Sequence, residues 1–187
     1  MGDARLSIDA AVACLRGGGV IAYPTEGVWG LGCDPLDEAA VLRLLALKQR
    51  AVDKGVILVG ASAAQFDGLA DWAALAPARV AEIRASWPGP HTWIVPASER
   101  VPRWITGTHD GVALRASAHP VVAALCIAFG GPIVSTSANT AGAPAPRAFD
   151  GLEAAIRDAV DGCVEGETGG RDGPSDIRDA RSGAVLR

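Results

Sequence analysis

The amino-acid sequence predicts one α/β domain over residues 1–187, built on a mixed sheet flanked by helices. Short apolar strand patterns alternate with helical patterns along the chain, which indicates the α/β class. The helices are unevenly spaced, which favours a mixed sheet over a regular doubly wound one. A chain of 187 residues, 49% of them hydrophobic, is long enough to bury a substantial core.

The elements follow from apolar periodicity and from glycine and proline stops. Ser7 is placed to cap a helix over residues 8–16, which Gly17-Gly18-Gly19 ends, and a short strand covers 20–23. The other predicted elements are a helix opened by Asp37 or Glu38, a strand over 56–59, helices near 62–70 and 76–86, strands over 91–96 and 112–115, a helix from His119-Pro120 to about Phe129, a strand over 132–135, a helix over 150–160, and short strands with glycine-rich turns up to Arg187.

Composition excludes several classes of protein. Net charge is −4 and the isoelectric point about 5.3, which argues against a generally basic nucleic-acid-binding protein but leaves a local basic patch open. No apolar run approaches the roughly 18 residues of a membrane-spanning helix. The first residues lack the basic and then apolar pattern of a signal peptide, so we expect no membrane association and a cytoplasmic location.

Lysine is almost absent from the basic residues. Of 17 basic residues only Lys48 and Lys54 are lysines. Two lysines this close together in an arginine-rich chain indicate a site that needs a compact ammonium group, with chance clustering on the surface as the alternative.

Two pairs of polar residues share an i, i+2 spacing. Lys48 and Arg50 follow the second predicted helix, and Ser137 and Asn139 follow a strand. Residues two apart diverge in a helix but share a face in extended chain, so a joint ligand requires the helix to end near Lys48. Together the pairs would suit a polyphosphate. The alternatives are a cationic helix C-terminus and a Ser/Asn helix cap.

Arg115 ends an apolar strand, so its stem starts near the core and its guanidinium needs an anionic partner. That partner is a ligand carboxylate or phosphate, or else an internal Asp or Glu. The three histidines, His91, His109 and His119, have no metal-ligand spacing, and no GxSxG or Ser-His-Asp pattern indicates a hydrolytic nucleophile.

Six segments in order carry a family resemblance. They are AYPTEGVWGLGCDP, LLALKQRAVDKGVIL, WPGPHTWIVPA, VALRASAHPVV, PIVSTSAN and GETGGRDGPSDIRD. Over about residue 7 to Arg187 the chain resembles the YrdC-type threonylcarbamoyl-AMP synthases, specifically their short bacterial form, TsaC. The resemblance implies a twisted mixed sheet with an open concave cleft, the YrdC-like fold, and no additional C-terminal domain.

The resemblance also implies a reaction. L-threonine, bicarbonate and ATP give threonylcarbamoyl-adenylate and pyrophosphate, and a downstream tRNA threonylcarbamoyl-transferase complex uses the product beside the anticodon of tRNA. Direct contact with tRNA stays open. Mg²⁺ would enter with ATP, held by phosphates and water, with no metal ligand that the sequence names.

Family motifs assign residues to each substrate. The residues implied for ATP and catalysis are Lys48, Arg50, Ser137 and Asn139, with Arg187 near the nucleotide. Those implied for threonine are Thr25, Arg115 and Ser175, with Ser135 and Ile57 as backbone contributors. The glycines of the first motif would let the backbone approach the ligands. Ala51 replaces a common proline, which leaves the role of Lys54 open.

Two other functions are compatible with these residues. A non-catalytic module for structured RNA, such as a tRNA or rRNA maturation factor, would use the same basic concavity, and its affinity would fall with salt. Carbamoyl transfer from carbamoyl phosphate would require further domains, which this sequence lacks.

Overall fold

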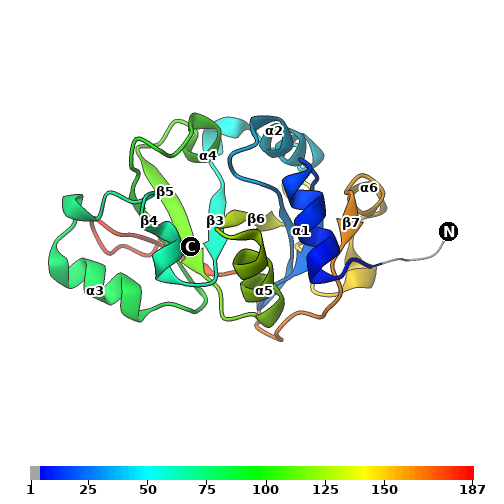
Figure 1. The fold of residues 1–187 in the computed structure, drawn as a ribbon. Helices are drawn as coiled ribbons and strands as arrows, with labels where there is room; N and C mark the ends of the chain where they lie inside the picture. Colours follow the sequence, from blue (N-terminus) through cyan, green and yellow to red (C-terminus); the bar gives the residue numbers. More distant parts are fainter. Residues whose placement is uncertain (1–4) are drawn as a thin grey trace.

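The computed structural model describes residues 5–187, and these form an eight-stranded sheet with helices on its faces (Figure 1). The strand order is β7-β1-β2-β6-β3-β5-β4-β8. The strands are β1 (Ile21–Pro24), β2 (Trp29–Gly32), β3 (Ile57–Gly60), β4 (His91–Pro96), β5 (Gly111–Ala116), β6 (Ile133–Ser137), β7 (Gly162–Cys163) and β8 (Asp176–Asp179).

The sheet is mixed, as predicted. β2 pairs antiparallel with both β1 and β6, and β6 pairs antiparallel with β3, whereas β3 and β5 are parallel. Both ends of the sheet carry parallel pairs, β1 with β7 and β4 with β8.

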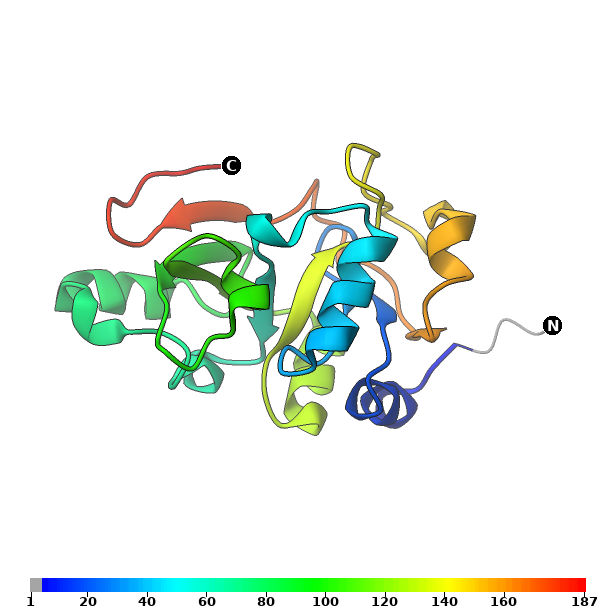
Figure 2. The same ribbon diagram turned by 90° about the horizontal axis from the view of Figure 1, so that it is seen from above.

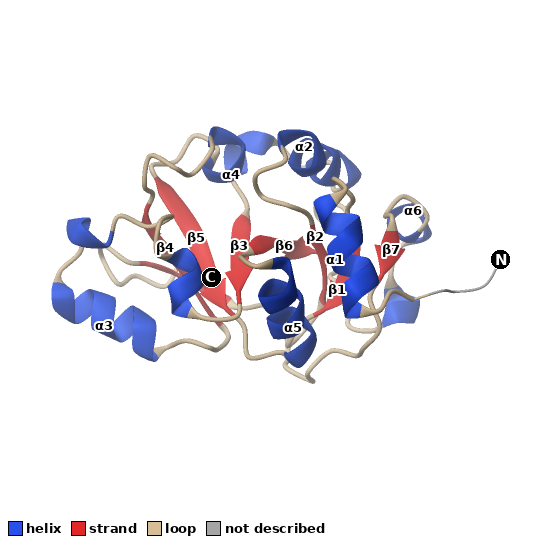
Figure 3. Ribbon diagram, in the orientation of Figure 1, coloured by secondary structure: helices blue, strands red, loops and turns tan. Residues whose placement is uncertain are grey.

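The helices largely follow the predictions (Figure 3). They are α1 (Ile8–Arg16), α2 (Glu38–Leu47), α3 (Pro77–Ala85), α4 (Arg103–Thr106), α5 (Pro120–Phe129) and α6 (Ala154–Arg157). The predicted caps are present, because Ser7 accepts from the Ala10 amide and Asp37 from the Ala40 amide, at 3.3 and 3.1 Å.

Two helix predictions were too long. The segment 62–70 contains only the 3₁₀ turn Ala63–Phe66. In place of the helix predicted over 150–160, the chain forms the 3₁₀ turn Phe149–Gly151 followed by α6. Few buried apolar residues face the core there, so packing does not extend the helices. Two further elements, α4 and β2, were not predicted from the sequence. β2 has two glycines in four residues and depends on pairing along both of its edges.

The sheet separates two apolar layers. Ile21 and Tyr23 of β1 pack with α1 and α5, whereas Ala22 between them belongs to the larger cluster on the opposite face. This alternation is expected of a strand covered on both sides. Figure 2 shows α1 and α5 lying together, apart from the C-terminal segment, which pairs with the edge strand β8 through Val185 and Arg178.

Candidate active site

A cleft of about 520 Å³ lies along β3, β5 and β6 and is closed by loops and the C-terminal segment. Ile57, Ala113 and Ser135 are cross-strand partners, so their side chains share one face at the floor of the cleft. The cleft collects every residue that the sequence assigned to a substrate: Thr25, Lys48, Arg50, Ile57, Arg115, Ser135, Ser137, Asn139, Ser175 and Arg187.

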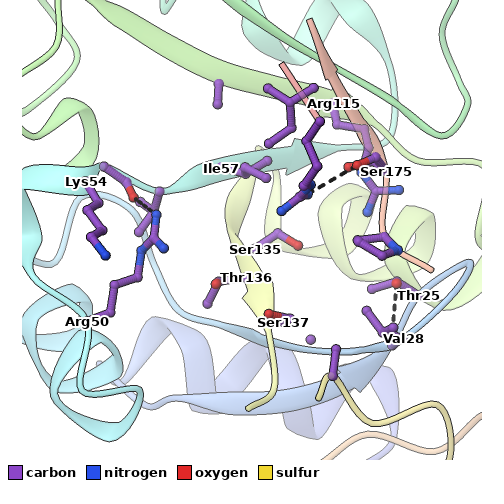
Figure 4. Close-up of a pocket in the computed structure, with 18 of the residues that line it drawn as sticks. Thr25, Val28, Arg50, Lys54, Ile57, Arg115, Ser135, Thr136, Ser137 and Ser175 are labelled. Carbon is purple, nitrogen blue, oxygen red and sulfur yellow. Dashed lines mark hydrogen bonds between the residues drawn. The ribbon is translucent and has the colours of Figure 1, made fainter. Parts of the chain in front are cut away.

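Most of the side chains predicted for ATP and for threonine lie at different ends of the cleft (Figure 4), but Arg187, predicted for ATP, bonds the Ser175 carbonyl. Arg50 and Lys54 lie on one side, and Thr25, Arg115 and Ser175 on the other. Ser135, Thr136 and Ser137 of β6 lie between them.

At the cationic end, the second helix stops where a joint ligand for Lys48 and Arg50 requires it to stop. α2 ends at Leu47, Lys48 is its C-cap residue, and Gln49 has a left-handed φ of 52°. This turn separates Arg50 from the helix and lets both cations line the cleft.

Lys48 is 4% exposed, and its ammonium is directed at the backbone of the segment that follows β6. Nζ donates to the carbonyl oxygen of Asn139 at 2.7 Å and to that of Ser137. Burial, with the neighbouring Arg50 charge, lowers the pKa of Lys48 to about 8. The ammonium has three donors, so one remains for a ligand.

The Ser137–Asn139 segment supports a loop and does not cap a helix, because residues 138–148 form turns and loop. The Asn139 amide nitrogen donates to the carbonyls of Thr140 and Ala143, at 2.9 and 2.7 Å. These two acceptors fix the amide orientation. The Asn139 Oδ1 atom is buried and has no hydrogen-bond partner among residues 5–187, so it is left to accept from a ligand.

Two further guanidiniums line the cleft, Arg50 at the cationic end and Arg187 beside Ser175. Arg50 donates to the Gly55 carbonyl at 3.1 Å, and Arg187 donates to the Ser175 carbonyl at 3.2 Å. Burial lowers the pKa of both, and Arg50 adds to the effect on Arg187. In the part of the chain described, 5–187, neither forms an ion pair with a carboxylate. Together they favour an anionic ligand.

At the polar end, each predicted threonine residue has a protein partner. The Thr25 hydroxyl donates to the Val28 carbonyl at 2.7 Å, and the Ser175 hydroxyl lies 2.7 Å from that of Thr92. Arg115 donates through Nη1 to Glu26 Oε2 at 2.7 Å. The internal carboxylate that the sequence left open as a partner of Arg115 is therefore present, and Arg115 still lines the cleft.

The glycines of the first motif serve the fold more directly than expected. A Cβ on Gly27 would lie 2.0 Å from the Gly173 carbonyl oxygen, and one on Gly32 would lie 2.7 Å from that of Val134. At these two positions the close approach is to the chain's own backbone, and the approach of the motif's backbone to ligands stays a prediction.

Sequence reasoning missed Glu26 and Thr92 as site residues. Glu26 stood inside the quoted Pro-Thr-Glu turn, so a search for the partner of Arg115 could have found it. Thr92, fully buried on β4, gave no signal, because its partner Ser175 is far away in the sequence.

The cleft's donor set suits anions more than a resident metal ion. Among residues 5–187, no three His, Cys, Asp or Glu side chains gather in a metal-binding group. Glu26 already accepts three hydrogen bonds, and Asp110 pairs with Arg181.

Comparison with known proteins agrees with this geometry. The family model Sua5/YciO/YrdC, described as "Telomere recombination", matches residues 13–187. A protein of Xanthomonas oryzae pv. oryzae named threonylcarbamoyl-AMP synthase is 62% identical over 185 residues, 97% of each chain.

Solved structures of a Sua5 protein also resemble this chain. Two structures of P. abyssi Sua5, one of them complexed with L-threonine, superpose with TM-scores of 0.89 and 0.82 at 34% identity. They cover 96% and 92% of this chain but only 55% and 50% of theirs, so the chain spans about half of that protein. The chain belongs to the Sua5/YciO/YrdC family.

Proposed function

We propose that the chain is a threonylcarbamoyl-AMP synthase, which forms threonylcarbamoyl-adenylate and pyrophosphate from L-threonine, bicarbonate and ATP. One observation carries the proposal: a single cleft joins Lys48, Arg50 and Arg187, which form no ion pair with a carboxylate of the described residues, to a polar end suited to an amino acid. The relative of the same length, 62% identical and named for this reaction, supports it.

ATP is proposed to place its phosphates at the cationic end. Lys48, Arg50 and Arg187 would bind phosphate oxygens, with the Ser137 hydroxyl beside them. Asn139 would contribute differently, because its amide donors are occupied and its free oxygen accepts from a hydroxyl or amine of the nucleoside. Lys54 lines the same end and would add positive charge there.

L-threonine is proposed to bind at the opposite end. Arg115 would hold its carboxylate, with Thr25 and Ser175 nearby and the backbone at Ile57 and Ser135 forming the floor. P. abyssi Sua5, crystallised with L-threonine, supports an amino-acid site in this fold.

The chemistry needs no covalent nucleophile from the protein. The threonine amine and bicarbonate give a carbamate with loss of water. A carbamate oxygen then attacks the α-phosphorus of ATP, the α–β bridging P–O bond breaks, and pyrophosphate leaves. The protein holds two anions in line, and positioning of this kind supplies about 7–11 kcal/mol of catalysis in favourable cases. Cations directed at the phosphates stabilise the charge that develops.

Mg²⁺ is proposed to arrive with ATP and to be held by phosphates and water. It would neutralise part of the triphosphate charge, and the cleft residues described above would orient the phosphates around it. Glu26 and Asp110 already accept hydrogen bonds from arginine side chains, which supports this assignment over a dedicated protein site for the ion.

The cellular setting is inferred from the same reaction. The product would pass to a tRNA threonylcarbamoyl-transferase complex for modification of the adenosine beside the anticodon, in the cytoplasm. Within residues 5–187, no helix is long and apolar enough to cross a membrane. The structured-RNA module is not favoured, because the 62% identical relative is named for the synthase reaction.

Pyrophosphate release from ATP tests the function directly. The purified protein should release pyrophosphate only when L-threonine and bicarbonate are both present, and less when serine replaces threonine. Salt-sensitive RNA binding without release under any combination would contradict the synthase function.

A further inference from the structure

Glu26 lies between the residues assigned to threonine, yet the proposed reaction gives it no role. It follows Thr25 in the β1–β2 turn, and its carboxylate bonds Arg115, 89 positions away in the sequence. The side chains of Arg115 and Glu26 are 8% and 17% exposed. A pair this buried has a fixed geometry, unlike the mobile ion pairs of a protein surface.

Both carboxylate oxygens of Glu26 are held. Oε2 accepts from Arg115 Nη1 at 2.7 Å, and Oε1 accepts from the Ser117 hydroxyl at 2.7 Å and from the Ala118 amide at 3.1 Å. Arg115 and Ser117 keep the pKa of Glu26 below its ordinary value despite its burial. The carboxylate is therefore a fixed anion at neutral pH.

The backbone of the same turn holds the loop that carries Ser175. The Gly169 amide donates to the Thr25 carbonyl at 3.0 Å, and the Arg171 amide donates to the Glu26 carbonyl at 2.9 Å. Glu26 thus connects the three parts of the threonine end: it neighbours Thr25, bonds Arg115, and anchors the loop before Ser175.

A guanidinium carries five N–H donors in a rigid fork. In the described residues, Arg115 has one hydrogen-bond partner, at Nη1. Fixing Nη1 fixes the whole plane and leaves the Nη2 and Nε donors, which is the arrangement that a second carboxylate binds bidentately.

We propose that Glu26 is a positioning residue for the amino-acid substrate: it holds Arg115 so that the remaining guanidinium donors meet the threonine carboxylate. The inference rests on the proposed function and adds a residue to its threonine site. Glu26 acts through Arg115 and contacts no reacting atom.

The test is Glu26→Gln, which keeps the shape of the side chain but removes its charge. The KM for threonine should rise roughly tenfold or more, the size expected for a charge-assisted hydrogen bond. The KM for ATP should stay within about twofold, because the phosphates bind at the other end.

A substrate analogue separates positioning from general damage. Threoninol has a hydroxymethyl group in place of the carboxylate, so it cannot use the fork of Arg115. Calorimetric titration should show that wild-type protein binds threonine more tightly than threoninol. In Glu26→Gln the ratio of these two affinities should be smaller. A structural defect alone would weaken both ligands alike.

Glu82→Gln is the matched control. Glu82 also pairs with an arginine, Arg79, at 2.7 Å, but on the surface of α3. Glu82→Gln should leave the KM for threonine and the KM for ATP unchanged. Should Glu26→Gln fail to fold, Ser117→Ala removes one donor to Glu26 and should raise the threonine KM by a smaller factor.

The outcomes are separable. The role of Glu26 alone is overturned if Glu26→Gln keeps both the threonine KM and the preference for threonine over threoninol. If Glu26→Gln does not fold, an unchanged threonine KM in Ser117→Ala overturns the same role. Absence of threonine-dependent pyrophosphate release in the wild type overturns the proposed function itself.

Discussion

The Lys48 ammonium donates to the carbonyl oxygen of Asn139 at 2.7 Å, and the Ala141 amide donates back to the Lys48 carbonyl at 2.8 Å. The segment that follows α2 and carries Lys48 is therefore bonded directly to the segment after β6 that carries Asn139. A compact ammonium directs its three donors tetrahedrally, so it can bond these two carbonyls and keep the third donor for a ligand, whereas a guanidinium holds its five donors in one plane. This explains a lysine here in a chain that otherwise prefers arginine.

Lys48→Ala should lower both turnover and stability. It removes a phosphate-facing charge and leaves the Ser137 and Asn139 carbonyls without their buried donor. We expect pyrophosphate release to fall at least about tenfold and the free energy of unfolding to fall by about 1–3 kcal/mol. Steady-state assay and urea unfolding measure the two. Lys54→Ala, at an exposed lysine, is the stability control, and near-normal turnover in Lys48→Ala would contradict the phosphate role.

Rising pH should move ATP affinity and stability in opposite directions. The pKa of Lys48 is about 8 in the folded protein and 10.5 without the fold's influence. The unfolded state therefore binds more protons between these values, so stability rises with pH across this window. ATP affinity falls through about pH 8 as the ammonium loses its charge.

Lys48→Arg separates these effects from other titrating groups, because a guanidinium stays charged throughout. Calorimetry with a non-hydrolysable ATP analogue and thermal unfolding, each taken as the difference between wild type and Lys48→Arg, should show both trends. Parallel pH profiles in the two proteins would assign the titration to another group.

Arg50→Gln should separate the two ends of the cleft. It removes a cation from the phosphate end, opposite Thr25 and Arg115 in Figure 4. We expect the KM for ATP to rise about tenfold or more, the effect of losing one charge-assisted hydrogen bond. Threonine binding measured without ATP should not change, and equal losses for both substrates would refute the separation.

Thr92→Val should weaken threonine binding through the loss of a hydrogen bond to Ser175. Thr92 is fully buried, and its hydroxyl bonds that of Ser175 at 2.7 Å. The substitution nearly keeps the volume and leaves Ser175 without its partner, so stability should fall by about 1 kcal/mol. The threonine KM should rise several-fold at unchanged ATP KM. Thr108→Val, at an exposed hydroxyl bonded to Asp53, provides the control.

Gly27→Ala should disturb the loop that carries Ser175. The new Cβ would lie 2.0 Å from the Gly173 carbonyl oxygen, so one of the two segments must move. Overpacking of this kind costs about 1–3 kcal/mol. Limited proteolysis should detect cleavage in residues 165–174 earlier than in wild type. Gly131→Ala, where a Cβ meets nothing within 4 Å, should behave as wild type.

The sequence by itself determined the class of the fold and predicted most of the residues discussed at the site, all of which line the cleft. Apolar periodicity and the Ser7 and Asp37 caps predicted α1 and α2, because these signals are local. The i, i+2 spacing required α2 to end near Lys48, and it does. The ordered motifs supplied the residues that line the cleft.

Only the tertiary structure decided how those residues are held. β2 exists because β1 and β6 supply hydrogen bonds on both sides, which outweighs the weak strand tendency of its glycines. Glu26 meets Arg115 and Ser175 meets Thr92 across 89 and 83 positions of the sequence. Such pairings depend on sheet order and register, and local sequence patterns carry no information about partners that only the folded chain brings together.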